Sequence, residues 1–328
     1  MNELRKGPAA RAAALLEVDE EDAGQRLDNF LSRILKGVPK SHVYRILRRG
    51  EVRVNSSRAG AHYRLTPGDR VRIPPIRVAK PSAGPKSPAP ALLSPHVLLE
   101  DEALLVLDKP AGIAVHGGSG ISRGVIEQFR LERPSARFLE LVHRLDRETS
   151  GVLLLAKRRS ALTELHRQLR AGEMDKRYIV LVAGRWADAI QHVRLPLHKY
   201  VTAAGERRVM VDEGGAGAHT EFRLHENIGK FSLLEARLKT GRTHQIRVHL
   251  AHLGFPIAGD DKYGDFALNK TLAKSGLKRM FLHAAALAFR HPLDGRRVDV
   301  HAPLPAELAQ FIARLRRDVS ELPGDSTD

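Results

Sequence analysis

An aspartate stands between two arginines in the segment HRLDRETSG, residues 143–151. Apolar runs flank this segment, FLELV before it and VLLLA after it. Both runs have the composition of strands, so we expect Asp146 in a loop between two of them. Removing a carboxylate from water is costly unless a cation keeps it ionised. An ionised and paired carboxylate in such a place can act as a nucleophile or as a base.

Two later segments carry side chains that could meet Asp146. In TGRTHQIRVHLAHLG, strand-like alternation puts Arg247 on the same side as Gln245 and His249, and puts Ile246 and Val248 opposite. A second segment, KRY, opens the apolar strand IVLVAG and places a phenol ring at its start. A buried Asp–Arg pair is more often architectural than catalytic, and a tyrosine at a strand end is usually packing.

The elements that must position these residues are mostly strands, with few helices among them. LDKPAG predicts a rigid corner, because it follows a buried strand with a proline and a glycine. Helices are predicted for VIEQFRLERP, ALTELHRQLRAG and PAELAQFIARLRR. Strands are predicted for FLELV, VLLLAK, RYIVLVAG, VMVDE, TEFRL, FSLLEARL and MFLHAAALAFRHP. We therefore predict an α+β unit with a central mixed, largely antiparallel sheet.

Charge separates a second, smaller unit from this one. The 328 residues hold 54 Lys and Arg against 38 Asp and Glu, for a net charge of +16 and a pI near 10.4. Residues 23–80 contain 14 of those cations and 3 of those acids. A balance this basic usually marks a polyanionic partner, and its concentration in one segment favours nucleic acid.

Composition also excludes several classes of protein. The absence of cysteine rules out disulfides, thiol nucleophiles and zinc or iron–sulfur sites with cysteine ligands. No apolar run approaches the roughly 20 residues of a spanning helix, and the N-terminal segment does not resemble a signal peptide. We expect a cytoplasmic protein without membrane contact.

The small unit reads as two helices on a short hairpin. Residues 26–35 have helical apolar spacing, and a second helix is predicted from a cap at Ser41 to Gly50. EVRVN and RVRIP alternate as strands, and the turn signal TPGD leads into the second of them. Their apolar residues are expected to face the helices, and Arg53, Arg70 and Arg72 to face solvent. These elements should therefore present one basic surface.

Segments poor in apolar residues set the domain boundaries. Residues 81–95, PSAGPKSPAPALLSP, contain five prolines and read as a semi-rigid tether. The sequence predicts a flexible N-terminus over 1–22, the basic domain over 23–80 and the large domain over 96–320. Residues 321–328 should form a flexible C-terminus.

The stretch VPKSHVYRILRRGEVRVN resembles the alpha-L RNA-binding domain first named for a small-subunit ribosomal protein. The resemblance covers about residues 23–75, and it joins a lysine–serine helix start, an arginine-rich helix and a glycine-to-strand step. Phosphate contacts should make binding steeply salt-dependent. The candidates for these contacts are Lys40, Arg45, Arg48, Arg49 and Arg53.

The large unit resembles the RluA-type pseudouridine synthases, and within them the RluC-like enzymes of large-subunit rRNA. The motifs LDKPAGIAVHGG, LVHRLDRETSGVLLLAK, KRYIVLVAG, TGRTHQIRVHL and RMFLHAAAL occur in the family's order behind an alpha-L domain. The resemblance implies isomerisation of uridine to pseudouridine in large-subunit ribosomal RNA, with the target nucleotide flipped out of the RNA. It implies no cofactor, no metal and no obligatory protein partner, and a monomer fits.

The resemblance also assigns roles to residues. Asp146 matches the essential catalytic aspartate, and Tyr178 matches the tyrosine that lies against the target base. Arg247 is expected to pair with the aspartate, and Ile246 to pack under the uracil. Arg144 corresponds to the arginine associated with displacing the target nucleotide. Tyr178 is also a candidate for removing the proton at carbon five.

Two other functions fit part of the sequence. A non-catalytic RNA-binding factor for ribosome assembly would share the basic domain, but it leaves the three catalytic candidates without a joint purpose. A metal-dependent hydrolase would use His244, His249 and His252. Their spacing does not match an H-E-x-x-H helix, and an extended QIRVHL segment would not put them on one face.

Overall fold

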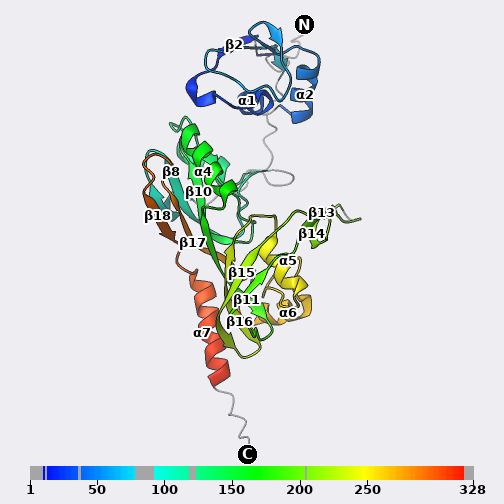
Figure 1. Ribbon diagram of the computed structural model, residues 1–328, viewed down its shortest axis with the longest axis vertical. Helices are drawn as coiled ribbons and strands as arrows, with labels where there is room; N and C mark the ends of the chain where they lie inside the picture. The colour runs from blue at the N-terminus through cyan, green and yellow to red at the C-terminus, as the bar shows by residue number, and fades with distance from the viewer. Residues whose placement is uncertain are drawn as a thin grey trace, which may run out of the picture. The chain divides into compact units, whose positions relative to one another are not determined.

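The computed structural model describes residues 10–11, 13–35, 38–77, 92–117, 123–203 and 205–320. The chain divides into two compact units, Met1–Pro90 and Ala91–Asp328 (Figure 1). Most of the predicted tether and the whole predicted C-terminal tail lie outside the described residues. Across the described ranges, every helix is too short or too polar to cross a lipid bilayer.

A four-stranded antiparallel sheet forms the base of the first unit. Its strand order is β2-β5-β3-β4. The bounds are β2 Ala14–Glu17, β3 Arg53–Val54, β4 Ser57–Arg58 and β5 Arg70–Ile73, and a separate pair joins β1 Ala10–Arg11 to β6 Ile76–Arg77. Because β2 pairs with β5 along its whole length, the sheet of the first unit includes residues before 23, which corrects the predicted boundary.

Two helices cover this sheet, α1 Leu27–Ile34 and α2 Lys40–Arg48, after a short 3-10 turn η1 at Glu20–Asp22. The apolar strand residues pack against them, and the arginines between them face solvent, as predicted. The predicted cap at Ser41 is wrong. The helix begins at Lys40, and its N-cap is Pro39, whose carbonyl accepts hydrogen bonds from the amides of His42 and Val43. Gly50 follows the helix with φ +70°, as predicted.

The second unit is built on a ten-stranded sheet with the main order β12-β15-β16-β11-β17-β10-β8-β7. Strand β18 pairs with β17, and β9 pairs with β10. Strands β10 and β17 run parallel and the other pairs are antiparallel, which confirms the mixed, largely antiparallel sheet. The first strands are β7 Val97–Glu100, β8 Leu104–Lys109, β9 Glu140–Leu141, β10 Ser150–Ala156 and β11 Asp175–Ala183. The later ones are β12 Ile190–Val193, β15 Thr220–Ile228, β16 Phe231–Leu238, β17 Leu282–Arg290 and β18 Arg297–His301.

The remaining elements of this unit pack around that sheet or extend from it. The helices are α3 Val125–Glu132, α4 Arg159–Ala171, α5 Gln245–His252, α6 Phe266–Lys274 and α7 Ala306–Ser320, with a 3-10 turn η2 at Ser94–His96. A two-stranded hairpin joins β13 Leu197–Val201 to β14 Arg207–Val211.

Strand alternation divides the core between the two faces of the sheet. On β10, Leu153 and Leu155 pack with α3 and α5, whereas Val152 and Leu154 pack with α4. Helices α6 and α7 share a further apolar cluster with β11 and β16. Figure 1 shows α4 alongside β10, and α7 alongside the strands β11, β15 and β16.

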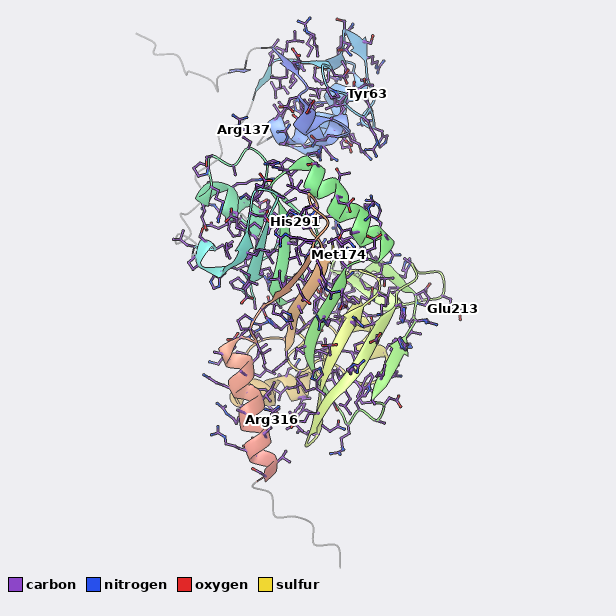
Figure 2. The ribbon with its side chains drawn as sticks, turned by 60° about the vertical axis from the view of Figure 1, so that its left-hand side comes forward. Tyr63, Arg137, Met174, Glu213, His291 and Arg316 are labelled. Atoms are coloured by element: carbon purple, nitrogen blue, oxygen red, sulfur yellow. The ribbon has the colours of Figure 1, made fainter. Side chains whose placement is uncertain are left out.

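The C-terminal helix α7 is amphipathic. Leu308, Phe311 and Ile312 are buried in the apolar cluster. Arg316 projects from the same helix (Figure 2), and its guanidinium lies 2.6 Å from a carboxylate oxygen of Glu226 on β15. The helix is therefore fixed to the sheet by apolar contacts on one side and by an ion pair at its edge.

The segment QIRVHLAH forms helix α5, so the predicted strand is wrong. Six of its eight residues are buried, which leaves no polar face to mark a helical period, and its β-branched residues imitate a strand. The helix has a consequence for the site. In a strand, Ile246 and Arg247 would point to opposite faces, but one helical step lets both face the same cleft.

Candidate active site

A cleft of about 680 Å³ opens on the sheet face that carries α5. Its walls are the loop after β9, the end of α4, the start of β11 and the segment from the end of β16 into α5. This cleft brings together all five residues predicted for catalysis and substrate binding: Arg144, Asp146, Tyr178, Ile246 and Arg247.

Asp146 lies in the loop between β9 and β10, as its flanking apolar runs predicted. The buried Lys109 anchors this loop, because its ammonium donates to the carbonyls of Pro110 and Ile113 at 2.8 Å and of Arg147 at 3.1 Å. The amide of Gly112 donates to the same carbonyl of Arg147 at 2.8 Å. The corner of the LDKPAG motif therefore holds the backbone next to Asp146. Burial lowers the pKa of Lys109 to about 7.

Gly151 explains the end of the TSG triplet. It is the second residue of β10, beside β17, with φ +106°, and a Cβ at this position would lie 2.2 Å from the carbonyl oxygen of Ala284. Only glycine fits both the backbone conformation and this close approach. The glycine therefore lets the loop that carries Asp146 join the parallel strand pair directly.

Arg247 connects Asp146 to a second, deeper carboxylate. Its Nη1 donates to Oδ2 of Asp146 at 3.2 Å, while Nε and Nη2 donate to Asp260 at 2.7 and 2.6 Å. The side chain of Asp260 is fully buried. Burial opposes charge on Arg247, but the hydrogen bond and charge of Asp260, followed by the charge of Asp146, outweigh it and raise the pKa. The guanidinium therefore stays charged and fixed beside Asp146.

The turn before α5 is locked by Gln245. Its Oε1 accepts hydrogen bonds from Thr240 and from the amide of Arg242, and its Nε2 donates to Thr220 and to the carbonyl of His219. This side chain uses its amide group fully, so it fixes the start of the helix that presents Arg247.

His244 and Tyr263 form a polar layer behind the Asp146–Arg247 pair. His244, with φ +54°, lies at the N-terminal end of α5, and its Nδ1 is 2.8 Å from the hydroxyl of Tyr263. That hydroxyl accepts from the amide of Val209, so it can donate its proton to Nδ1. The tautomer assigned in this way carries its proton on Nε2, which lies 3.8 Å from Asp146. Burial lowers the pKa of His244 despite the charge of Asp146.

Tyr178 and Ile246 supply the apolar surface of the cleft. Both are buried and belong to the main core cluster. Burial, with a smaller contribution from the charge of Asp146, raises the pKa of Tyr178. Its ring therefore offers a flat apolar face and a protonated hydroxyl beside an acid. Arg144 lines the same cleft with an exposed side chain.

The predicted phosphate contacts belong to the first unit. Arg45, Arg48, Arg49 and Arg53 are all exposed, on or directly after α2 and on β3. Lys40 is the first residue of α2, but its side chain lies outside the described part of the structure. The arginines thus form a solvent-facing basic strip along α2 and into β3.

Three supporting residues are not indicated by the sequence, namely Asp260, Tyr263 and Lys109. Asp260 lies in the loop segment GDDKYG between α5 and α6, which has no periodicity. One weak signal is the combination of two adjacent acids and a tyrosine after an apolar run. Lys109 is expected at a rigid corner, but nothing in the sequence indicates that its ammonium binds three carbonyls.

Two of the three histidines considered for a metal site, His244 and His249, have other partners. His249 is engaged at both ring nitrogens, 3.0 Å from the hydroxyl of Thr220 and 3.0 Å from the carbonyl of Leu195. Among the described residues there is no group of three His, Cys, Asp or Glu side chains arranged to hold a metal ion. The cleft instead combines a cation-paired carboxylate with an aromatic face, a set suited to attack on a sugar beside a flat base.

Comparison with known proteins agrees with these features. Residues 103–252 match the family model described as RNA pseudouridylate synthase, and residues 25–71 match the S4 domain. The chain is 50% identical to ribosomal large subunit pseudouridine synthase C of Pasteurella multocida, over 94% of this chain and 96% of that protein. It is 51% identical to the protein of the same name from Escherichia coli K12, over 92% and 96% of the two chains.

A solved structure extends the likeness to the fold. Human RNA pseudouridylate synthase domain containing 4 aligns with 68% of this chain and 94% of its own, at a TM-score of 0.56 and 25% identity. The two bacterial relatives and the solved structure thus point to one and the same family of proteins.

Proposed function

The chain belongs to the family of ribosomal large subunit pseudouridine synthases C, and from this premise we propose that it isomerises specific uridines of large-subunit rRNA to pseudouridine. The observation that carries the proposal is the hydrogen bond from Arg247 to Asp146 beside the ring of Tyr178, all within one cleft. The proposal includes a cytoplasmic location and action as a monomer without an obligatory protein partner.

The reaction moves one bond. The bond between the anomeric carbon and ring nitrogen one breaks, the uracil turns, and the anomeric carbon bonds to ring carbon five. The proton on carbon five leaves, and nitrogen one gains a proton. The product has the same atoms as the substrate, and no electron is transferred to another molecule. The reaction therefore needs a nucleophile or base and groups that move protons, which are side chains that this chain has.

Asp146 is the residue that starts this sequence. Its carboxylate can attack the anomeric carbon to give a glycosyl ester, or it can remove a ribose proton to give a glycal. Both routes need an ionised carboxylate in a fixed place. Arg247 supplies the positive charge that compensates this carboxylate, and its hydrogen bond fixes the orientation of Asp146. The separated uracil stays bound against Tyr178 and Ile246 while it turns.

The target uridine must leave its stack to reach this cleft. Extrusion of a base costs a few kcal/mol, which contacts elsewhere on the RNA must offset. Arg144 lines the cleft with an exposed guanidinium and is suited to take the place of the extruded nucleotide. The basic strip of the first unit supplies further contacts to the RNA.

The proposal is tested in cells that lack the gene. Pseudouridines of their large-subunit rRNA are mapped chemically, and the strain is complemented with the wild-type chain or with Asp146→Asn. We expect specific pseudouridines to disappear, to return with the wild type and to stay absent with the variant. An unchanged map in the deletion strain would instead favour the alternative, a non-catalytic assembly factor.

A further inference from the structure

Six lysine and arginine side chains line the cleft, and three of them have partners. Arg247 is bound by Asp260. Lys239 lies 3.2 Å from a carboxylate oxygen of Glu221, and Arg242 donates to a backbone carbonyl. The other three form no hydrogen bond or ion pair with a described residue: Arg144, Arg170 and Lys176.

Of these three, Lys176 is the one enclosed by the protein. Arg144 and Arg170 are exposed, whereas Lys176 is partly buried at the start of β11. It lies two residues before Tyr178, and both side chains face the cleft. The ammonium reaches across to the loop before α5, where it lies 3.8 Å from the position that a Cβ of Gly241 would take.

The neighbouring acid does not neutralise this ammonium. Asp175 precedes Lys176, so strand alternation directs its side chain to the other face. There both of its carboxylate oxygens accept hydrogen bonds from Arg237 at 2.6 Å. Burial accordingly lowers the pKa of Lys176, and the charge of Asp175 offsets only part of that effect.

A partly buried ammonium without an anionic partner costs desolvation free energy that the charge of Asp175 offsets only in part. An anion that the ligand brings into the cleft would offset this cost. The ligand under the proposed function is a single RNA strand with one base extruded, and its anionic groups are phosphodiesters. Two residues of a strand span about 6.6 Å, so an anion at Lys176 would lie near a base stacked on Tyr178.

We propose that Lys176 forms a phosphate subsite, in which its ammonium binds one phosphodiester of the RNA strand adjacent to the target uridine. The inference rests on the proposed function and adds to it a contact that fixes the strand inside the cleft. Arg170, exposed at the end of α4 on the cleft wall, extends this subsite toward solvent. The subsite is distinct from the acid–arginine pair and from the basic strip of the first unit.

The test replaces single phosphates of the substrate. A set of large-subunit rRNA fragments is made, each with a mapped target uridine that is tritiated at carbon five. Each modified fragment carries a single neutral methylphosphonate, placed at one of the two phosphates on either side of that uridine. Tritium release gives kcat/KM for the wild type, for Lys176→Met and for Lys270→Met. Lys270 is exposed on α6 and has no partner among the described residues, so it is the matched control.

We expect one methylphosphonate to lower kcat/KM of the wild type and of Lys270→Met at least tenfold. With the unmodified fragment, kcat/KM of Lys176→Met should be about tenfold lower than that of the wild type, and the same methylphosphonate should not lower it further. A methylphosphonate at any other position should change kcat/KM of all three proteins by the same factor. The salt dependence of Lys176→Met should also be shallower, by about 0.7 in the log–log slope. Lys176→Arg should recover part of the activity, because it restores the charge.

Two results would overturn the inference. One is that no methylphosphonate near the target affects the wild type. The other is that every methylphosphonate lowers kcat/KM of Lys176→Met by the same factor as kcat/KM of the wild type. Lys176→Gln takes the place of Lys176→Met if the methionine variant unfolds. Failure of the proposed function has a different signature, since the wild-type chain would then release no tritium from any fragment.

Discussion

Arg247 is held more closely by Asp260 than by Asp146, with two hydrogen bonds of 2.6 and 2.7 Å to the first and one of 3.2 Å to the second. The buried acid therefore fixes the guanidinium, and the guanidinium in turn fixes the acid in the cleft. Two nitrogens of the arginine are used by the fold, which leaves a single nitrogen for Asp146. This arrangement makes Asp260 a positioning residue.

Replacing Asp260 should loosen this chain of contacts. Asp260→Asn keeps an accepting oxygen but leaves the buried charge of Arg247 poorly compensated, which we expect to destabilise the large unit by about 3–5 kcal/mol in urea unfolding. At a temperature where the variant stays folded, kcat should fall more than tenfold while KM changes little. The exposed Glu173→Gln, which removes a surface ion pair with Arg167, is the control and should unfold like the wild type. Equal stability of Asp260→Asn and wild type would contradict the positioning role.

The hydroxyl of Tyr178 can be separated from its ring. The raised pKa keeps this hydroxyl protonated, so it can relay the proton of carbon five but cannot act as a phenolate. We expect Tyr178→Phe to bind RNA normally and to fall on the order of 10²-fold or more in tritium release. Tyr178→Leu should in addition raise KM, because it removes the ring face. Wild-type turnover by Tyr178→Phe would confine the residue to stacking.

Acid should destabilise the large unit partly through His143. Burial and the charge of Lys176 lower its pKa to about 4, and its Nε2 accepts a hydrogen bond from the amide of Leu154 at 3.1 Å. Between about pH 6.5 and 4 the unfolded chain therefore binds a proton here that the folded chain does not, so stability falls as the pH is lowered.

The contribution of His143 is isolated by difference. The free energy of unfolding of the wild type minus that of His143→Gln should shrink as the pH falls from 6.5 to 4. A difference for His143→Gln that is independent of pH would show that this ring is not the titrating group.

The basic strip of the first unit should control salt sensitivity. Replacing Arg45, Arg48 and Arg49 by glutamine is expected to weaken rRNA binding and to reduce the slope of log affinity against log salt by up to about 0.9 for each phosphate that is no longer neutralised. Arg33→Gln on α1, which already pairs with Asp22, should change the slope much less. An unaltered slope in the triple variant would remove this strip from the RNA-binding surface.

Much of the fold could be predicted because its signals are local. The alternation in RVRIP predicted that Val71 and Ile73 face the core, and both are buried. The glycine at the end of ALTELHRQLRAG, Gly172, ends α4 with φ +70°. Asp146 could be placed in a loop because two apolar runs flank it. Strand β2 could not be predicted because four residues, ALLE, are too few to separate a strand from a tail.

The rest depends on contacts between distant segments. Helix α5 is buried on nearly every side, so its sequence lacks the polar face that distinguishes a helix from a strand. Asp260 lies 13 residues after Arg247, in a loop, and only the folded chain brings the two side chains together. The same is true of Lys176, whose lack of a partner among the described residues is a property of the fold and not of the sequence.

The most direct measurement is tritium release from carbon five of uridine in large-subunit rRNA of the deletion strain, with Asp146→Asn as the enzyme. We predict RNA binding like that of the wild type and a fall in turnover on the order of 10⁴-fold or more. Asp188→Asn, an exposed aspartate without a described partner, should turn over like the wild type. Wild-type release by Asp146→Asn would contradict the central role of this carboxylate.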